Sequence, residues 1–189
     1  MGMFEYVVVL TSIIIGLALA HLAKGLASLI QHPGRTRIWW VHLVWVAYMF
    51  LNTLFWWWWE FRYHNIKTWT VQLYLFVVGY AFLLYLICAL LFPKDLEGYE
   101  GFKDYLLSRR FWFFGLQILY AVVDLFDSWF KGADYFASLG REYLIAQVIY
   151  IGLPVIGMVT RNERVQGAIT LVFLVYQMSW TLRIYETVS

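Results

Sequence analysis

The chain has 189 residues, of which 62% are hydrophobic and 14% are charged, and its mean hydropathy is +0.66. A soluble domain of this length cannot bury so much apolar surface, whereas a lipid bilayer can, so these values exclude an ordinary soluble protein. The net charge of +2 arises from scattered basic residues without a cluster, which argues against nucleic acid as a partner.

Six continuous apolar stretches follow one another along the chain, each close to the roughly 20 residues that a helix needs to cross a bilayer. Because the apolar runs do not alternate with polar residues, we predict helices rather than the strands of a β-barrel. The expected fold is all-α: a single transmembrane domain over residues 1–189, built as a six-span helical bundle with short loops. The predicted spans are Phe4–Gln31, Ile38–Trp59, Thr70–Phe92, Phe111–Phe130, Tyr143–Val159 and Val165–Tyr185.

The first predicted span ends at His32-Pro33-Gly34, which breaks the helical pattern. Within it, Ala18-Leu19-Ala20 has the small-x-small form of a signal-peptide cleavage site. However, no Lys or Arg precedes the apolar run, and the helical pattern continues beyond residue 20. We therefore expect an uncleaved membrane span.

The second predicted span ends in four consecutive tryptophans that are followed at once by Glu60. A tryptophan ring is apolar but carries one N–H, so it is most stable where the hydrocarbon of a membrane meets the headgroups. The run therefore predicts the position of a membrane boundary. Neighbouring rings point about 100° apart on a helix, so they cannot all face one ligand. We interpret them as interfacial anchors: Trp56, Trp57, Trp58 and Trp59.

The only long connection follows Pro93, between the third and fourth predicted spans. Over residues 95–110 it mixes apolar side chains such as Leu96, Tyr99 and Phe102 with charges. This pattern predicts an amphipathic helix that lies along the membrane interface.

The basic residues favour one orientation in the membrane. Eight Lys and Arg residues lie in the first, third and fifth connections, against five on the opposite side. Because cytoplasmic loops carry an excess of basic residues, we expect the odd connections in the cytoplasm and both termini outside. The predicted location is the inner (plasma) membrane of a bacterium, with both termini on the periplasmic side.

Polar side chains form stripes on the predicted helices, where they are costly unless they are paired or face water. At a rise of about 1.5 Å per residue, His21 lies roughly 15 Å and Asp124 roughly 20 Å from the cytoplasmic side, so we expect them to meet near mid-membrane. Histidine changes charge near neutral pH, and such a pair would relay protons or bind a small cation. The candidate lining of a polar cavity is His21, Lys24, His42, Asn52, Gln117, Asp124 and Gln177.

The alternative is that these side chains only hydrogen-bond helices to one another, at roughly 0.6 kcal/mol per bond. That interpretation is favoured for the amide side chains. Both remain open for His21, Lys24 and Asp124, because three ionisable groups at depth are expensive for packing alone. The stripe of the fourth span runs from Gln117 through Tyr120 and Asp124 and ends with Asp127 and Lys131. These two are one turn apart in the favourable sign order and predict an interfacial ion pair.

Motifs for a metal, a cofactor or a catalytic nucleophile are missing from the sequence. It contains neither HxxxH nor HExxH, and its single cysteine, Cys88, excludes a cysteine pair. A haem held by two histidines needs both at similar depth, but His21 and His42 differ by roughly 9 Å. There is no GxSxG either. We therefore expect no cofactor, no metal and no catalytic residue.

Three classes of function remain. The favoured one is a small channel or carrier that passes protons, ions or a small polar solute through the polar cavity. The second is a sensor or accessory protein that binds lipid, a planar apolar ligand or a partner membrane protein through its aromatic residues, which make up 21% of the chain. An intramembrane enzyme using His21 and Asp124 is the weakest, because no substrate-recognition motif accompanies the pair. Lipid is the expected partner in every case, and self-association is compatible with all three.

Overall fold

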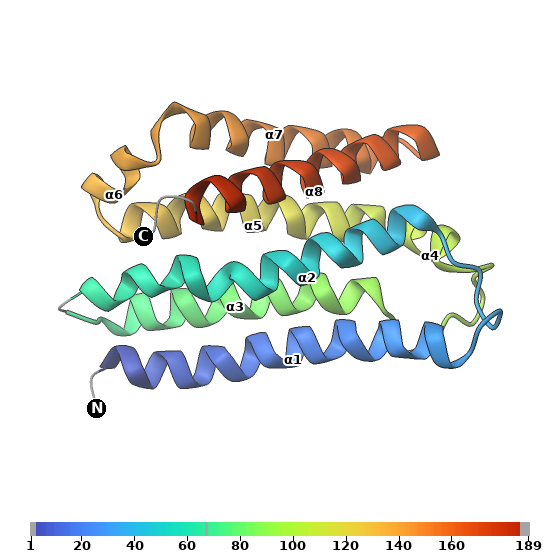
Figure 1. Cartoon of the computed structure of the whole chain (residues 1–189), viewed down its shortest axis with the longest axis horizontal. Coiled ribbons are helices and arrows are strands. Elements are labelled where there is room, and N and C mark those ends of the chain that lie inside the picture. The colour runs from blue at the N-terminus through green and yellow to red at the C-terminus, as the bar shows by residue number, and fades with distance from the viewer. Residues whose placement is uncertain (1–2, 67, 186–189) are drawn as a thin grey trace.

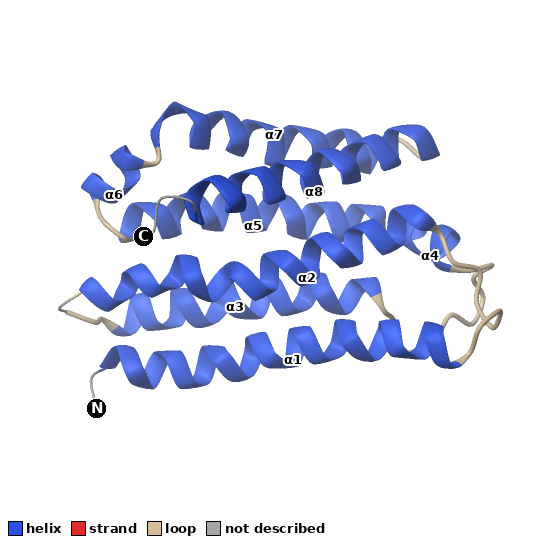
Figure 2. Ribbon diagram, viewed as in Figure 1, coloured by secondary structure: helices blue, strands red, loops and turns tan. Residues whose placement is uncertain are grey.

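The computed structural model describes residues 3–66 and 68–185, and within these ranges every regular element is a helix (Figure 1, Figure 2). The predicted all-helical class is confirmed. Three short elements are the 3-10 helix η1 (Phe61–Asn65), α4 (Phe102–Ser108) and α6 (Ala133–Ser138). The long helices are α1 (Met3–Gln31), α2 (Trp40–Glu60), α3 (Val71–Leu91), α5 (Arg110–Phe130), α7 (Gly140–Val159) and α8 (Glu163–Tyr185).

Five of the long helices, namely α1, α3, α5, α7 and α8, are long and apolar enough to cross a membrane. The chain therefore has the make-up of a helical membrane protein. The 21-residue α2 is not among the five. Its tryptophans and its polar residues His42, Asn52 and Glu60 lower its mean hydropathy, although its length equals that of α3.

The helices form two layers that run along the long axis of the molecule (Figure 1). In one layer α1, α3, α5 and α7 pack side by side in that order, and in the other α2 packs against α8. The second layer lies over the first because α2 also contacts α1 and α3, and α8 contacts α7. α1 begins and α8 ends at the same end of the bundle as η1 and α6, whereas α4 lies at the opposite end (Figure 1).

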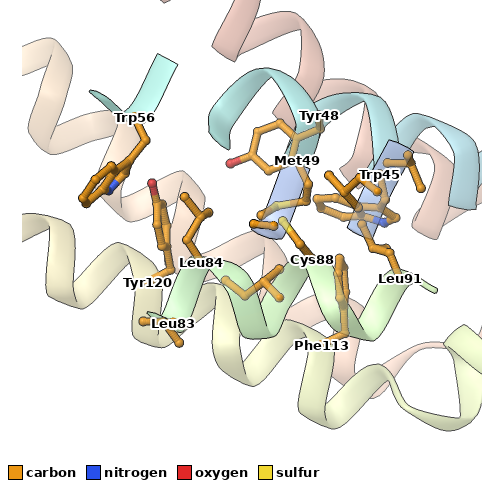
Figure 3. Packing of buried hydrophobic residues seen from close by; sticks show 14 of the residues in the cluster. Trp45, Tyr48, Met49, Trp56, Leu83, Leu84, Cys88, Leu91, Phe113 and Tyr120 are labelled. Atoms are coloured by element: carbon orange, nitrogen blue, oxygen red, sulfur yellow. The ribbon is translucent and has the colours of Figure 1, made fainter. Parts of the chain in front are cut away.

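The buried face of α2 follows helical spacing and forms the centre of the core. Trp45 and Met49 point towards Cys88 and Phe113 across the core (Figure 3). The indole of Trp45 is fully buried, and its ring centroid lies 5.0 Å from that of Phe113 and 5.2 Å from that of Phe173. Edge-to-face contacts of this kind add to the apolar burial and fix α2 between α5 and α8.

The predicted helix over residues 95–110 is much shorter than expected. Only the seven residues of α4 are helical before α5 begins, and Phe102 and Leu106 are buried against the bundle. Gly98 and Gly101 have φ angles of 81° and 151°, which end any helix before α4. A Cβ on Gly101 would lie 2.7 Å from the carbonyl oxygen of Arg37, so this close approach requires glycine.

Candidate functional site

A cavity lies between α2, α5, α7 and α8 and offers about 110 Å³ to the centres of water-sized molecules. This space is enough for several ordered waters or a small solute. It extends from Gln117 and Phe173 near the middle of the bundle to Lys131 and Tyr135 at the end where α1 begins. Much of its wall is aromatic, with side chains of Tyr48, Trp59, Tyr120, Tyr135, Tyr143, Tyr150, Phe173, Tyr176 and Trp180.

The half-buried Asp124 on α5 supplies a carboxylate to the cavity wall. Its Oδ1 accepts a hydrogen bond from the hydroxyl of Tyr80 at 3.0 Å. Its Oδ2 accepts one from the hydroxyl of Tyr143 at 2.7 Å and one from Nε2 of Gln147 at 2.6 Å. These three donors suit an ionised carboxylate, but all are neutral, and no cation of the described residues lies within ion-pair distance of it.

A buried ionic cluster lies at one end of this cavity. Nζ of Lys131 donates to Oε1 of Glu60 at 3.0 Å and to Oδ2 of Asp127, and the three side chains are between 1% and 3% exposed. The hydroxyl of Tyr63 donates to Oδ1 of Asp127 at 2.8 Å. The ion pair between Asp127 and Lys131 follows from the sequence, because the two residues are one helical turn apart at the end of α5.

The charge on Lys131 is well supported by its surroundings. Burial disfavours the ammonium, but the neighbouring carboxylates of Glu60 and Asp127 outweigh that effect and raise the pKa of Lys131 above its ordinary value. Its Nζ also lies 5.2 Å from the ring centroid of Tyr63 and 5.9 Å from that of Tyr135. Aromatic rings at this end of the cavity therefore already accommodate one ammonium group.

The formal charges at this end of the bundle do not balance. Asp124, Asp127 and Glu60 carry three carboxyl groups, and Lys131 is the one cation within ion-pair distance of any of them among the described residues. Unpaired carboxylates in a low-dielectric site are costly. The site therefore favours the uptake of a proton or of another cation.

Four of the seven predicted cavity residues line this cavity: Asn52, Gln117, Asp124 and Gln177. Nδ2 of Asn52 donates to the hydroxyl of Tyr120 at 3.0 Å, so at least this amide does link two helices. Nε2 of Gln177 is 3.5 Å from the hydroxyl of Thr181, a weak contact within α8.

The two predicted histidines lie elsewhere, at the C-terminal end of α3. Nε2 of His21 lies 2.9 Å from the carbonyl oxygen of Phe92, and Nε2 of His42 lies 2.7 Å from that of Leu91. The last carbonyls of a helix have no partner within the helix. Here two imidazole N–H groups satisfy them inside the bundle, where water cannot.

The structure does not bring His21 and Asp124 together, so the expected pair is not formed. Each side chain has other partners, because α1 packs against α2 and α3, and α3 lies between α1 and the helix α5 that carries Asp124. Lys24 is exposed on the outer surface of α1 and does not line the cavity. The similar predicted depth of His21 and Asp124 in the membrane therefore did not predict a contact between them.

The four tryptophans at the end of α2 face different surroundings. Trp56 is fully buried with its ring centroid 5.8 Å from that of Tyr80, whereas Trp58 is 57% exposed. Trp57 and Trp59 are half-buried, and Trp59 lines the cavity.

Three residues of the site were not predicted from the sequence: Tyr80, Tyr143 and Glu60. Tyr143 stands one turn before Gln147 on the same face of its helix, which is a usable signal. Glu60 follows an apolar span directly, at the same predicted boundary as Lys131. Nothing in the sequence around Tyr80 distinguishes it from the other aromatic residues of its span.

No protein-family model, no curated protein and no solved structure matches this chain. The class that the fold and the cavity define is thus a helical membrane protein with an acidic, aromatic-walled site inside its bundle.

Proposed function

We propose that this protein is a six-span inner-membrane carrier that binds a small cation or a proton at Asp124, inside the cavity between α2, α5, α7 and α8. The observation that carries the proposal is the Asp124 carboxylate, which faces the cavity and receives only neutral donors. An ionisable group inside a membrane bundle typically marks a pathway for protons or solutes.

The packing of α2 supports its assignment as the sixth span. Its polar residues His42, Asn52 and Glu60 are buried within the bundle and do not face lipid. The strongly exposed large side chains of α2, in contrast, are Trp40, Leu54 and Trp58, which suit the hydrocarbon and its boundaries. The 21 residues of α2 span about 31 Å, the thickness of a bilayer core.

An even number of spans fits the start of α1 and the end of α8 on one side of the bundle (Figure 1). With the basic connections in the cytoplasm, this side is the periplasmic one. The end of the cavity at Lys131 and Tyr135 then lies towards the periplasm. We propose that lipid covers the exposed apolar side chains of the long helices.

The aromatic core favours a carrier over an open channel. Towards the cytoplasmic end, Trp45, Phe113, Phe114 and Phe173 are at most 1% exposed and fill the space below the cavity. The ring centroids of the three phenylalanines lie 5.0 to 5.8 Å from that of Trp45. Passage of a solute therefore requires these rings to move, as in a protein that opens to one side at a time.

Reconstitution into liposomes tests the proposal. Under imposed gradients, proteoliposomes should pass protons, K⁺ or methylammonium faster than protein-free liposomes. Asp124→Asn should lower that flux at least tenfold, while the control Asp104→Asn, on the exposed surface of α4, should leave it unchanged. Absence of flux of all three species, or equal flux in wild type and Asp124→Asn, would contradict the proposal.

The aromatic walls also favour a second candidate, a sensor or accessory protein that binds its ligand without moving it. This function predicts ligand binding at the cavity that depends on Asp124, together with no flux in liposomes. The two readouts separate it from a carrier.

A further inference from the structure

We infer that the solute taken up by the cavity is a small protonated amine, an organic ammonium ion with at least one N–H group. The inference rests on the proposed function, because it takes the cavity to be a solute site. Three features of the site favour this class of ligand: the charge of the site, the aromatic side chains of its walls and a hydrogen-bond acceptor that has no donor.

The charge of the site requires a cation from outside the chain. Asp124 receives hydrogen bonds from two tyrosine hydroxyls and one amide, none of which is charged. The nearby ammonium of Lys131 is already shared by Glu60 and Asp127. One negative charge at the cavity wall therefore remains without a counterion.

The walls suit an organic cation better than a metal ion. Ca²⁺ and Mg²⁺ are held by a shell of oxygen atoms that includes carboxylates, and the described residues contain no group of three acidic, histidine or cysteine side chains placed for a metal. Aromatic rings line the cavity together with Asp124 instead, among them Tyr48, Tyr150 and Phe173. The faces of such rings attract ammonium groups, and the alkyl part of an amine packs against them.

An unused acceptor lies beside the carboxylate. Gln147 is 5% exposed and lines the cavity, and its Nε2 is bonded to Asp124 while its Oε1 has no hydrogen-bond partner among the described residues. A buried polar atom without a partner is costly. An amine N–H next to Asp124 would supply the missing donor and a positive charge together.

The space is consistent with a ligand of a few heavy atoms. A cavity of about 110 Å³ for the centres of water-sized molecules exceeds what one water needs by several fold. A short alkylammonium ion fits this size, and propylammonium is a suitable probe.

Calorimetric titration of the purified full-length protein with propylammonium chloride tests the inference. Propylammonium should bind, while 1-propanol, a neutral molecule of similar shape, and K⁺ should bind at least tenfold more weakly. Asp124→Asn should weaken propylammonium binding at least tenfold. A second pair of variants tests the aromatic ring: Tyr150→Phe keeps a ring and Tyr150→Leu removes it, so Tyr150→Leu should bind propylammonium about fivefold more weakly than Tyr150→Phe.

Equal binding of propanol would show an apolar pocket, and equal binding of K⁺ an inorganic cation site; either result overturns the inference. If propylammonium does not bind but the liposomes show proton or K⁺ flux that depends on Asp124, the ligand class is refuted and the proposed carrier function stands. Neither binding nor flux would refute both.

Discussion

The hydroxyl of Tyr143 on α7 lies between two side chains of α5: it donates to Oδ2 of Asp124 at 2.7 Å and lies 3.0 Å from Oγ of Ser128. This contact joins the two helices that form one side of the cavity. It also orients the carboxylate on which the proposed binding of a cation depends.

Tyr143→Phe should therefore lower stability by about 1–2 kcal/mol, because the variant leaves a buried carboxylate oxygen with one donor fewer. It should also weaken ligand binding, since Asp124 would lose part of its orientation. Thermal unfolding in detergent measures the first effect. Tyr150→Phe is the matched control, because the Tyr150 hydroxyl forms no hydrogen bond with the described residues, and its unfolding temperature should stay close to that of wild type. Equal losses in both variants would contradict the role given to Tyr143.

Lys131→Met should lower stability by about 3–5 kcal/mol, because it leaves the carboxylates of Glu60 and Asp127 buried without a cation. Acidification should restore part of the loss by neutralising these carboxylates. In wild type, the raised pKa of Lys131 has no such effect on stability at acidic pH. The stability that Lys131 contributes is fully present below the ordinary lysine pKa of about 10.4 and declines only at higher pH. Unfolding curves of both proteins between pH 5 and 9 should thus converge towards acidic pH. Curves that run parallel would count against the ionic cluster.

Gly25→Ala should destabilise the bundle by about 1–3 kcal/mol, because a Cβ there would lie 2.2 Å from ring atoms of Phe92. Displacement of Phe92 would also disturb its carbonyl contact with His21. Gly16→Ala on the same helix is the control, since a Cβ at Gly16 meets no atom within 4 Å. That change should be neutral or stabilise by up to about 1 kcal/mol through helix propensity. A Gly25→Ala protein as stable as Gly16→Ala would show that α1 and α3 are not packed this closely.

His42→Leu should cost about 2–3 kcal/mol, since it leaves the buried carbonyl of Leu91 without its donor and removes the ring stacked at 4.2 Å on Phe102. His32→Leu, at an exposed position after α1, should change stability by less than about 0.5 kcal/mol. Chemical denaturation of the two variants side by side checks the difference. Indistinguishable midpoints would refute the capping of α3 by His42.

The stripes within single helices could be predicted from the sequence. The spacing of the second predicted span places His42, Trp45, Met49, Asn52, Trp56 and Trp59 on one face; the structure buries the first five and leaves Trp59 half-buried. The stripe of the fourth predicted span, from Gln117 through Asp124 to Lys131, likewise lies along the cavity. Periodicity gives such faces because it depends only on the geometry of one helix.

The neighbours of each helix could not be predicted in the same way. His21 and Asp124 have similar depth, yet their helices are separated in the row, so depth along the axis did not reveal lateral distance. The end of α3 was predicted to within one residue, but the sequence did not show that the carbonyls of Leu91 and Phe92 at this end accept hydrogen bonds from His42 and His21. The order of helices follows from tertiary packing, which no single segment encodes.

The most direct test of the central claim is whether the cavity beside Asp124 can be reached from the periplasmic side. Ala121→Cys places a thiol on the cavity wall, one turn before Asp124, and Ala81→Cys places one in the closed core. The labelling rate is measured in sealed right-side-out vesicles with a membrane-impermeant, positively charged thiol reagent. Wild type gives the background rate, because its only cysteine, Cys88, is fully buried. We predict labelling of Ala121→Cys at least tenfold faster than that of Ala81→Cys, and slower labelling in the presence of propylammonium. Labelling of Ala121→Cys at the rate of Ala81→Cys would contradict the account.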